Sequence, residues 1–118
     1  MRELKDKVKL IGQKGEMEVD ALFDTGAVYG YVSKEIADKI GLVIYPEAQD
    51  IDLSDRRSVK MKPALGLVEI KGCRKTLYTF VNESPLSDMT LGMWQMEAMG
   101  IKIDAQRGYT VSCERPRA

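Results

Sequence analysis

The segment best able to carry chemistry is Ala21–Ala27, with the sequence ALFDTGA, in which a carboxylate follows an apolar run. An acid directly after a buried strand costs free energy unless it is hydrogen-bonded or functional. Thr25 places a hydroxyl beside this acid, and Gly26 allows a sharp turn and the close approach of another chain or ligand. The segment therefore predicts a turn that presents Asp24 on a rigid base. The alternative is an Asx-turn in which Asp24 only caps the strand end.

The composition excludes several other kinds of catalysis. Among its 118 residues the chain has no His, so Ser-His-Asp and Cys-His mechanisms and histidine-ligated zinc or haem are excluded. Two cysteines, Cys73 and Cys113, cannot form a four-cysteine zinc site and are too far apart in sequence for a Cys-x-x-Cys redox pair. We expect them to be reduced, half-buried thiols, because the chain reads as cytosolic. A disulfide is the open alternative, since the sequence does not give their distance.

The charge balance indicates which partners to expect. The 18 Lys and Arg equal the 18 Asp and Glu. Arg56, Arg57, Lys60 and Lys62 form a small basic cluster with acids close by, which is typical of a solvated surface, so no nucleic-acid partner is expected. No stretch approaches the roughly 20 apolar residues that span a bilayer, so no membrane partner is expected. The charged residues 1–7 precede no apolar run, which predicts a cytoplasmic protein without a signal peptide.

Strands and short helices must position the Asp24 turn. Apolar residues alternate with charged ones over 7–10 and 16–21, on either side of Gly12–Gly15, which predicts a β-hairpin leading into the buried segment before Asp24. Ser33 and Gly41 are expected to cap a helix over 34–40, followed by a strand over 42–44. A hairpin over 51–61 should follow.

The second half repeats this organisation. Strands are predicted over 65–70, 77–81, 101–104 and 109–113, and a short helix over 94–99. The segments 36–44 and 95–103 are alike, each a helix, a glycine and a short apolar strand, which hints at two related halves. We expect one all-β domain over 1–118, with one or two short helices and a core spanning about 8–113.

The motifs resemble those of a known family. Leu22–Ala27 resembles the active-site signature of the aspartic proteases: two apolar residues, Asp-Thr-Gly, then Ala or Ser. Leu91-Gly92 before a short helix resembles the second signature, and Val32 lies where the family has an apolar residue closing the strand after the turn. The resemblance covers about 8–103. With one motif in one short chain, it is closest to the retropepsin-like branch, and it implies a closed β-barrel of the acid protease fold with one lobe per chain.

The resemblance also implies an activity. Retropepsin-like enzymes are homodimers, so Asp24 from each chain would meet its counterpart at a two-fold axis, and the two carboxylates would share a proton and activate a water. The chain would then be an aspartic endopeptidase acting on a peptide or protein substrate, with no metal or organic cofactor. A catalytically silent retropepsin-like module for dimerisation or peptide binding is the alternative.

Roles near the active-site turn follow from the matching positions. The resemblance implies that Thr25 forms a hydrogen bond across the dimer axis and that the Gly26 carbonyl contacts the substrate backbone. Ala27 and Val28 would line the substrate cleft. Leu91 and Gly92 are also assigned to the cleft, with their loop packed beneath the turn. Val28 and Tyr29 replace acidic residues of viral members, so substrate contacts should differ.

The resemblance assigns the flap, a hairpin that closes over bound peptide, to residues 51–61. Its tip would be Ser54, Asp55, Arg56 and Arg57, which include no glycine, in contrast to viral members. A tip at 63–66 is the alternative.

Aromatic and methionine residues complete the list of candidates. Tyr29 and Tyr31 are candidates for shaping substrate pockets, one of them more structural than the other. The segment 109–113 is the best candidate for a dimer strand. Core packing together with part of the dimer interface is expected for Met89, Met93, Trp94, Met96 and Met99.

Overall fold

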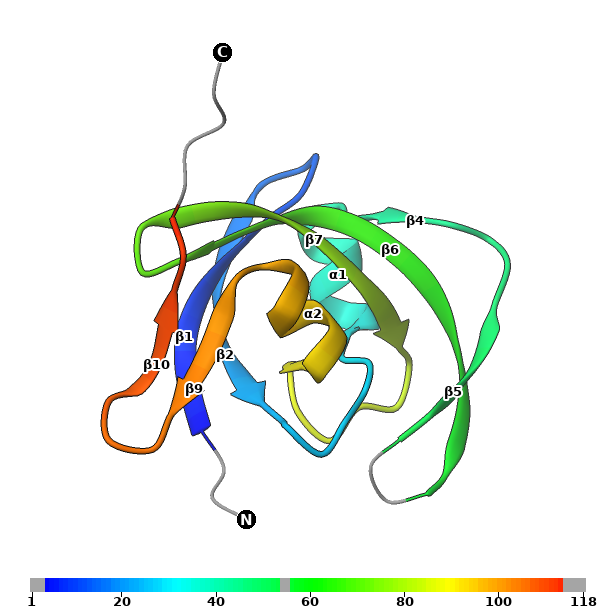
Figure 1. Cartoon of the computed structure of the whole chain (residues 1–118). Coiled ribbons are helices and arrows are strands. Elements are labelled where there is room, and N and C mark those ends of the chain that lie inside the picture. Colours follow the sequence, from blue (N-terminus) through cyan, green and yellow to red (C-terminus); the bar gives the residue numbers. More distant parts are fainter. Residues whose placement is uncertain (1–3, 54–55, 114–118) are drawn as a thin grey trace.

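The structure is a computed structural model that describes residues 4–53 and 56–113. These residues form strands and two short helices joined by turns and loops (Figure 1). The helices are α1 (Lys34–Ile40) and α2 (Met93–Ala98). The strands are β1 (Leu4–Ile11), β2 (Glu16–Phe23), β3 (Tyr31–Ser33), β4 (Val43–Ile44), β5 (Gln49–Asp52), β6 (Ser58–Ile70), β7 (Cys73–Asn82), β8 (Met89–Leu91), β9 (Ile101–Asp104) and β10 (Gly108–Val111).

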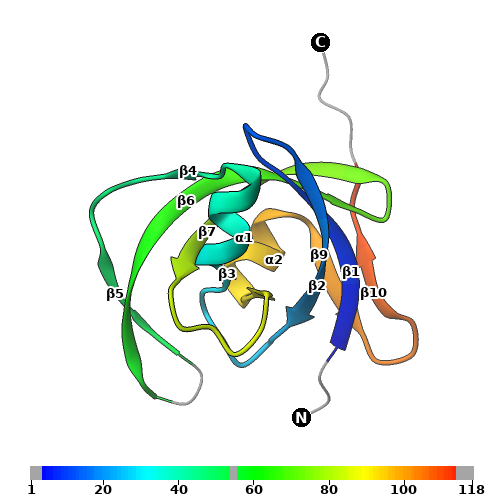
Figure 2. The same cartoon turned by 180° about the vertical axis from the view of Figure 1, so that it is seen from behind.

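Six of these strands close into a barrel. The order is β1-β2-β8-β3-β7-β6, and β6 returns to pair with β1 through Lys9–Ile11. The β2–β8 and β3–β7 pairs are parallel, whereas the other pairs around the ring are antiparallel. In both views the two helices lie between the long, curved β6–β7 ribbon and the β1–β2 hairpin (Figure 1, Figure 2). The closed all-β barrel with short helices confirms the predicted fold class.

Local sequence signals explain the elements next to the site. The β1–β2 hairpin pairs Val8 with Val19, so the alternating apolar residues face inward together. Ser33 caps α1 by accepting a hydrogen bond from the Ile36 amide at 3.3 Å. Gly41 ends α1 in the left-handed conformation, with φ of 76°. Neither helix in the described ranges is long and apolar enough to cross a membrane.

One main core fills the barrel. It draws on every strand of the ring and on both helices, and it is fully buried at Leu10, Val32, Leu77, Met89 and Leu91. Met89, Met96 and Met99 belong to this core, as predicted, whereas Met93 and Trp94 are exposed. A smaller core of Tyr31, Ile51 and Met61 lies apart from it.

The β9–β10 hairpin forms a separate two-stranded sheet beside β1 (Figure 1). Tyr109 holds it there: its ring lies 4.6 Å from that of Phe23, and its hydroxyl donates to Asp6 Oδ2 at 2.5 Å. Burial and the Asp6 carboxylate raise the pKa of the Tyr109 phenol above its ordinary value. The predicted strand over 109–113 begins at Gly108 and ends at Val111.

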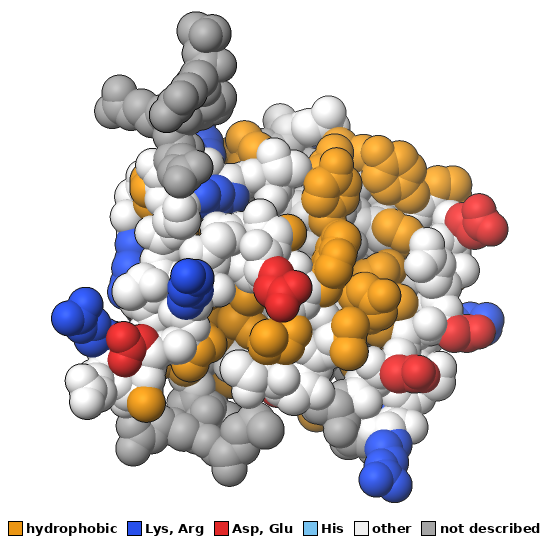
Figure 3. All heavy atoms as spheres, viewed as in Figure 1, with side chains coloured by type: hydrophobic (Ala, Val, Ile, Leu, Met, Phe, Trp, Pro, Cys, Tyr) orange, Lys and Arg blue, Asp and Glu red, His pale blue; other side chains and the backbone are white. Residues whose placement is uncertain are grey.

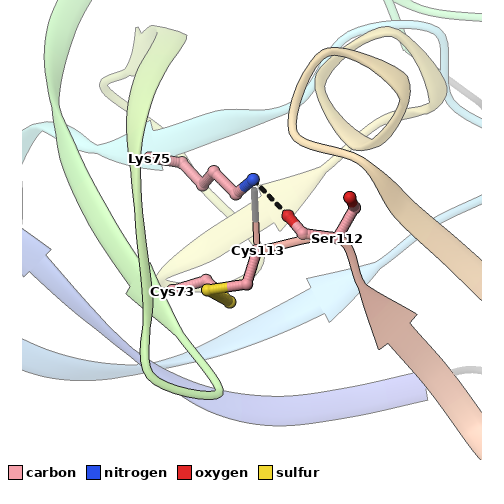
Figure 4. Close-up of a disulfide and its surroundings, with 4 residues drawn as sticks. All are labelled: Cys73, Lys75, Ser112 and Cys113. Carbon is pink, nitrogen blue, oxygen red and sulfur yellow. Dashed lines mark hydrogen bonds between the residues drawn. A yellow bond between two sulfur atoms is a disulfide. The ribbon is translucent and has the colours of Figure 1, made fainter. Parts of the chain in front are cut away.

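The expectation of two reduced thiols is wrong in this structure. Cys73 and Cys113 form a disulfide, with their Cα atoms 5.4 Å apart (Figure 4). The Lys75 ammonium also donates to the Ser112 carbonyl, so the start of β7 is tied to the segment after β10 at two points. The two cysteines are 40 positions apart in sequence, and the fold brings them together in a way that spacing alone did not reveal.

Candidate active site

The Asp24 turn begins where β2 ends. The parallel pairing places Phe23 opposite Leu91, and the Asp24 amide donates to the Leu91 carbonyl at 3.0 Å. The Gly26 amide donates to Asp24 Oδ1 at 2.9 Å, which is the Asx-turn considered above. Oδ2 has no hydrogen-bond partner among residues 4–53 and 56–113. The turn therefore orients the carboxylate while leaving one oxygen available.

Gly92 and the first residues of α2, which follow β8, pack against the Asp24 turn and hold it by hydrogen bonds. The Met93 amide donates to the Ala27 carbonyl at 2.8 Å, and the Trp94 amide donates to the Val28 carbonyl at 3.0 Å. The two loops lie so close that a Cβ on Gly92 would sit 2.6 Å from the Val28 carbonyl oxygen. This contact explains physically why a glycine follows Leu91.

Gln95 holds the supporting loop against β7. Its side chain is 2% exposed, and its Oε1 accepts a hydrogen bond from the Gly92 amide at 2.9 Å. Its Nε2 donates to the Tyr78 carbonyl at 2.9 Å. Gln95 was not predicted as a site residue, although a polar residue among apolar ones in a short helix is a signal that could have identified it.

A cleft of about 320 Å³ opens beside Asp24. Both apolar and polar side chains line it, and Asp24 is the one acid among them in the described part of the chain. Lys5 and Arg57 contribute cationic groups. The other lining residues are Leu22, Ala27, Tyr29, Tyr31, Leu53, Leu86, Ser87 and Thr90.

The β5–β6 hairpin forms one side of the cleft through Leu53 and Arg57. Its turn is closed by a hydrogen bond from the Leu53 amide to the Arg57 carbonyl at 2.8 Å. Arg56 adopts a left-handed conformation there, with φ of 69°. Of the proposed tip residues, Ser54 and Asp55 lie outside the described residues. The alternative tip at 63–66 is wrong, because these residues pair with β7 in the middle of β6.

The structure places the predicted residues of the Asp-Thr-Gly-Ala turn in two environments. Asp24 and Ala27 line the cleft. Thr25 and Gly26 are exposed beside them, and Thr25 borders a second groove between α2 and β9.

Leu91, Gly92 and Val28 were assigned to the cleft but do not line it. Leu91 is fully buried in the main core, and Gly92 is buried beneath the turn. The Val28 side chain is 59% exposed and is not among the residues that line the cleft, and its carbonyl accepts a hydrogen bond from the Trp94 amide.

Several cleft residues were not predicted from the sequence. Lys5 lies there because it pairs with Leu22, a position that counting back from the hairpin turn could have found. Ser87 and Thr90 precede the Leu91-Gly92 motif, and their hydroxyl oxygens lie 3.1 Å apart. The Tyr31 hydroxyl lies 3.3 Å from Ser87 Oγ, so both Tyr29 and Tyr31 line the cleft.

Solved structures show which fold this is. The retroviral protease-like domain of Ddi1 from Leishmania major is similar with a TM-score of 0.71 and 19% identity, over 94% of this chain and 89% of that one. The EIAV protease in complex with inhibitor HBY-793 is similar with a TM-score of 0.68 and 16% identity, over 87% of this chain and 93% of that one. A retropepsin-like aspartic protease from Rickettsia conorii is similar with a TM-score of 0.58 and 19% identity, over 93% of this chain and 87% of that one.

The chain therefore has the retropepsin-like fold over most of its length, as the motifs predicted. Comparison of the sequence with models of protein families gives no match, and neither does comparison with curated proteins. At these identities the likeness concerns the fold.

Proposed function

We propose that the chain is an aspartic endopeptidase that hydrolyses peptide bonds as a homodimer, with Asp24 from each copy as the catalytic residue. One observation carries the proposal. Asp24 follows the largely buried last residues of β2 and is fixed by backbone hydrogen bonds, with its carboxylate at a cleft that the β5–β6 hairpin borders. Burying this carboxylate in the core would cost free energy, and an ordinary surface acid would not need the backbone hydrogen bonds that fix Asp24.

The proposed chemistry follows from two carboxylates about 3 Å apart, which cannot both be ionised easily. The pair holds one proton. The ionised carboxylate takes a proton from a water as that water attacks the scissile carbonyl carbon, while the protonated carboxyl donates to the carbonyl oxygen. Transfer of a proton to the leaving nitrogen then completes cleavage, so activity should be highest on the acid side of neutrality.

A second copy is needed because Asp24 is the one carboxylate that residues 4–53 and 56–113 of one chain supply to the cleft. Thr25 and Gly26, which follow Asp24, are exposed, and we place the contact with that copy at this turn. The groove bordered by Thr25 and Ile103 continues from this surface toward β9. A two-fold axis beside Asp24 would make the contact self-complementary.

The test is cleavage of a diverse peptide mixture from pH 3 to 7. Asp24→Asn keeps the size of the side chain and removes the ionisable group, and we expect it to abolish cleavage. Asp20→Asn is the matched control, because Asp20 is an exposed acid on β2, the strand that leads into the Asp24 turn, and we expect this variant to cleave like the parent. Undiminished cleavage by Asp24→Asn would refute the proposal.

The second candidate is a peptide-binding module that holds an extended segment in the same cleft without cutting it. Asp24 is the one carboxylate that the described part of the chain places in the cleft, which favours this module if the protein is a monomer. Sedimentation at high protein concentration separates the two candidates. A strict monomer that binds peptides would support the module and count against the protease.

A further inference from the structure

An exposed group of aromatic side chains lies beside the cleft. We call Tyr29, Tyr78, Phe80 and Trp94 the aromatic patch. Tyr78 is 56% exposed, Trp94 46% and Tyr29 38%. Figure 3 shows hydrophobic side chains gathered on the face where α2 and β7 lie. Contiguous exposed apolar surface of this kind commonly marks a binding site.

The aromatic patch is continuous with the cleft. Tyr29 belongs to both, since it lines the cleft and makes edge-on contacts with Phe80 and Trp94 at ring distances of 5.6 and 6.0 Å. Phe80 also packs against the small core that contains Tyr31, another cleft residue. A ligand that leaves the cleft past Tyr29 therefore meets Trp94 next.

The aromatic patch is held in place by the backbone contacts that support the Asp24 turn. The Trp94 amide donates to the Val28 carbonyl, which fixes α2 beside Tyr29. The Gln95 side chain donates to the Tyr78 carbonyl, which fixes β7 beside α2. Rings held in advance by such contacts lose little conformational entropy when they bind a ligand.

We propose that the aromatic patch extends the substrate cleft and binds apolar or aromatic side chains of an extended peptide, outside the scissile bond. The proposal rests on the function proposed above, because it names the substrate class of the same cleft. Side chains on one face of an extended peptide are about 6.6 Å apart. The Tyr29–Trp94 and Tyr78–Trp94 ring distances of 6.0 and 6.4 Å match this spacing. The preferred substrates therefore carry large apolar residues at alternate positions.

Trp94 makes the test direct, because it is the one tryptophan of the chain and its fluorescence reports on the aromatic patch. The probe is acetyl-Glu-Thr-Phe-Thr-Phe-Thr-Glu-amide, titrated into the Asp24→Asn variant of the 118-residue chain so that no cleavage interferes. The comparison peptide has both Phe residues replaced by Ser. We expect a saturable change in emission with the Phe peptide and at least about tenfold weaker binding of the Ser peptide.

Two variants in the Asp24→Asn protein locate the binding. Tyr78→Ala keeps the reporter and removes an exposed side chain of the aromatic patch, and we expect about tenfold weaker binding. Tyr45→Ala is the control, since Tyr45 is 49% exposed and belongs to neither the cleft nor the aromatic patch. It should bind like the parent.

Equal binding of the two peptides, or parental binding by Tyr78→Ala, would overturn the proposal. A second copy covering the aromatic patch would also overturn it, and would appear as dissociation of the dimer in Trp94→Ala. Failure of the proposed function has a different signature: the Phe peptide would bind as expected, but the parent protein would cleave nothing between pH 3 and 7. If the parent cleaves peptides with and without large apolar residues at the same rate, the proposed endopeptidase activity stands and the proposed role of the aromatic patch is wrong.

Discussion

Replacing Gln95 tests whether the supporting loop is held as the structure shows. Gln95→Met keeps an unbranched side chain of similar volume, so it removes two hydrogen bonds without opening a large cavity. The buried Gly92 amide then loses its acceptor, and the Tyr78 carbonyl loses a donor. An unsatisfied buried amide costs about 1–3 kcal/mol, and the part-buried carbonyl, which water can reach, adds about 0.5–1.5 kcal/mol.

We therefore expect Gln95→Met to lower the free energy of unfolding by about 2–4 kcal/mol. Urea unfolding followed by circular dichroism measures it, at one fixed protein concentration because a dimer's stability depends on concentration. Gln106→Met is the control, since Gln106 is exposed in the turn between β9 and β10. A loss below about 0.5 kcal/mol, as for an ordinary surface substitution, would show that Gln95 does not hold the loop.

Three further substitutions probe the close approach, the disulfide and the ionisation of Tyr109. Gly30→Ala should lower the melting temperature more than Gly66→Ala does. A Cβ at position 30 would lie 1.9 Å from the Thr90 carbonyl oxygen, whereas the nearest atom to a Cβ at position 66 is the end of the Leu42 side chain. Equal losses of melting temperature in the two variants would contradict this prediction. Cys113→Ser should lower the free energy of unfolding by up to about 4 kcal/mol, the loop-closure entropy for 40 residues, and adding reductant to the parent should reproduce the loss; a variant as stable as the oxidised parent would show that the disulfide does not form. The folded protein holds the Tyr109 proton more tightly than the unfolded chain does, so this contribution to stability is complete below about pH 10 and declines as the pH rises above it. Tyr109→Phe should be less stable than the parent at pH 7 and should lose less stability between pH 9 and 11, and parallel pH profiles in urea unfolding would contradict this assignment.

Much of the fold could be predicted because its signals are local. Alternation over 7–10 and 16–21 gave the β1–β2 hairpin, and Ser33 and Gly41 gave both ends of α1. The Asp24 turn and the Leu91-Gly92 motif were found for the same reason: each depends on a few consecutive residues. The structure shows how the two motifs are connected: β2 and β8 pair in parallel, and the loops that follow them lie too close together for a side chain at Gly92.

What failed depends on contacts between distant segments. The Cys73–Cys113 pairing results from the return of β10 to the start of β7, and no local pattern carries that information. Val28 was assigned to the cleft from its position in the motif, but its side chain is exposed and does not line the cleft of one chain. Gln95 and Lys5 were missed because their roles depend on which strands lie beside them.

A mixing experiment tests most directly whether Asp24 of two copies forms one active site. Parent and Asp24→Asn chains are unfolded together in equal amounts, refolded, and assayed for peptide cleavage against the same total amount of parent. If both copies must supply Asp24, only parent–parent dimers are active, and the mixture should retain about a quarter of the parent activity. Retention of about half would mean that each chain cleaves on its own, and would contradict the shared site.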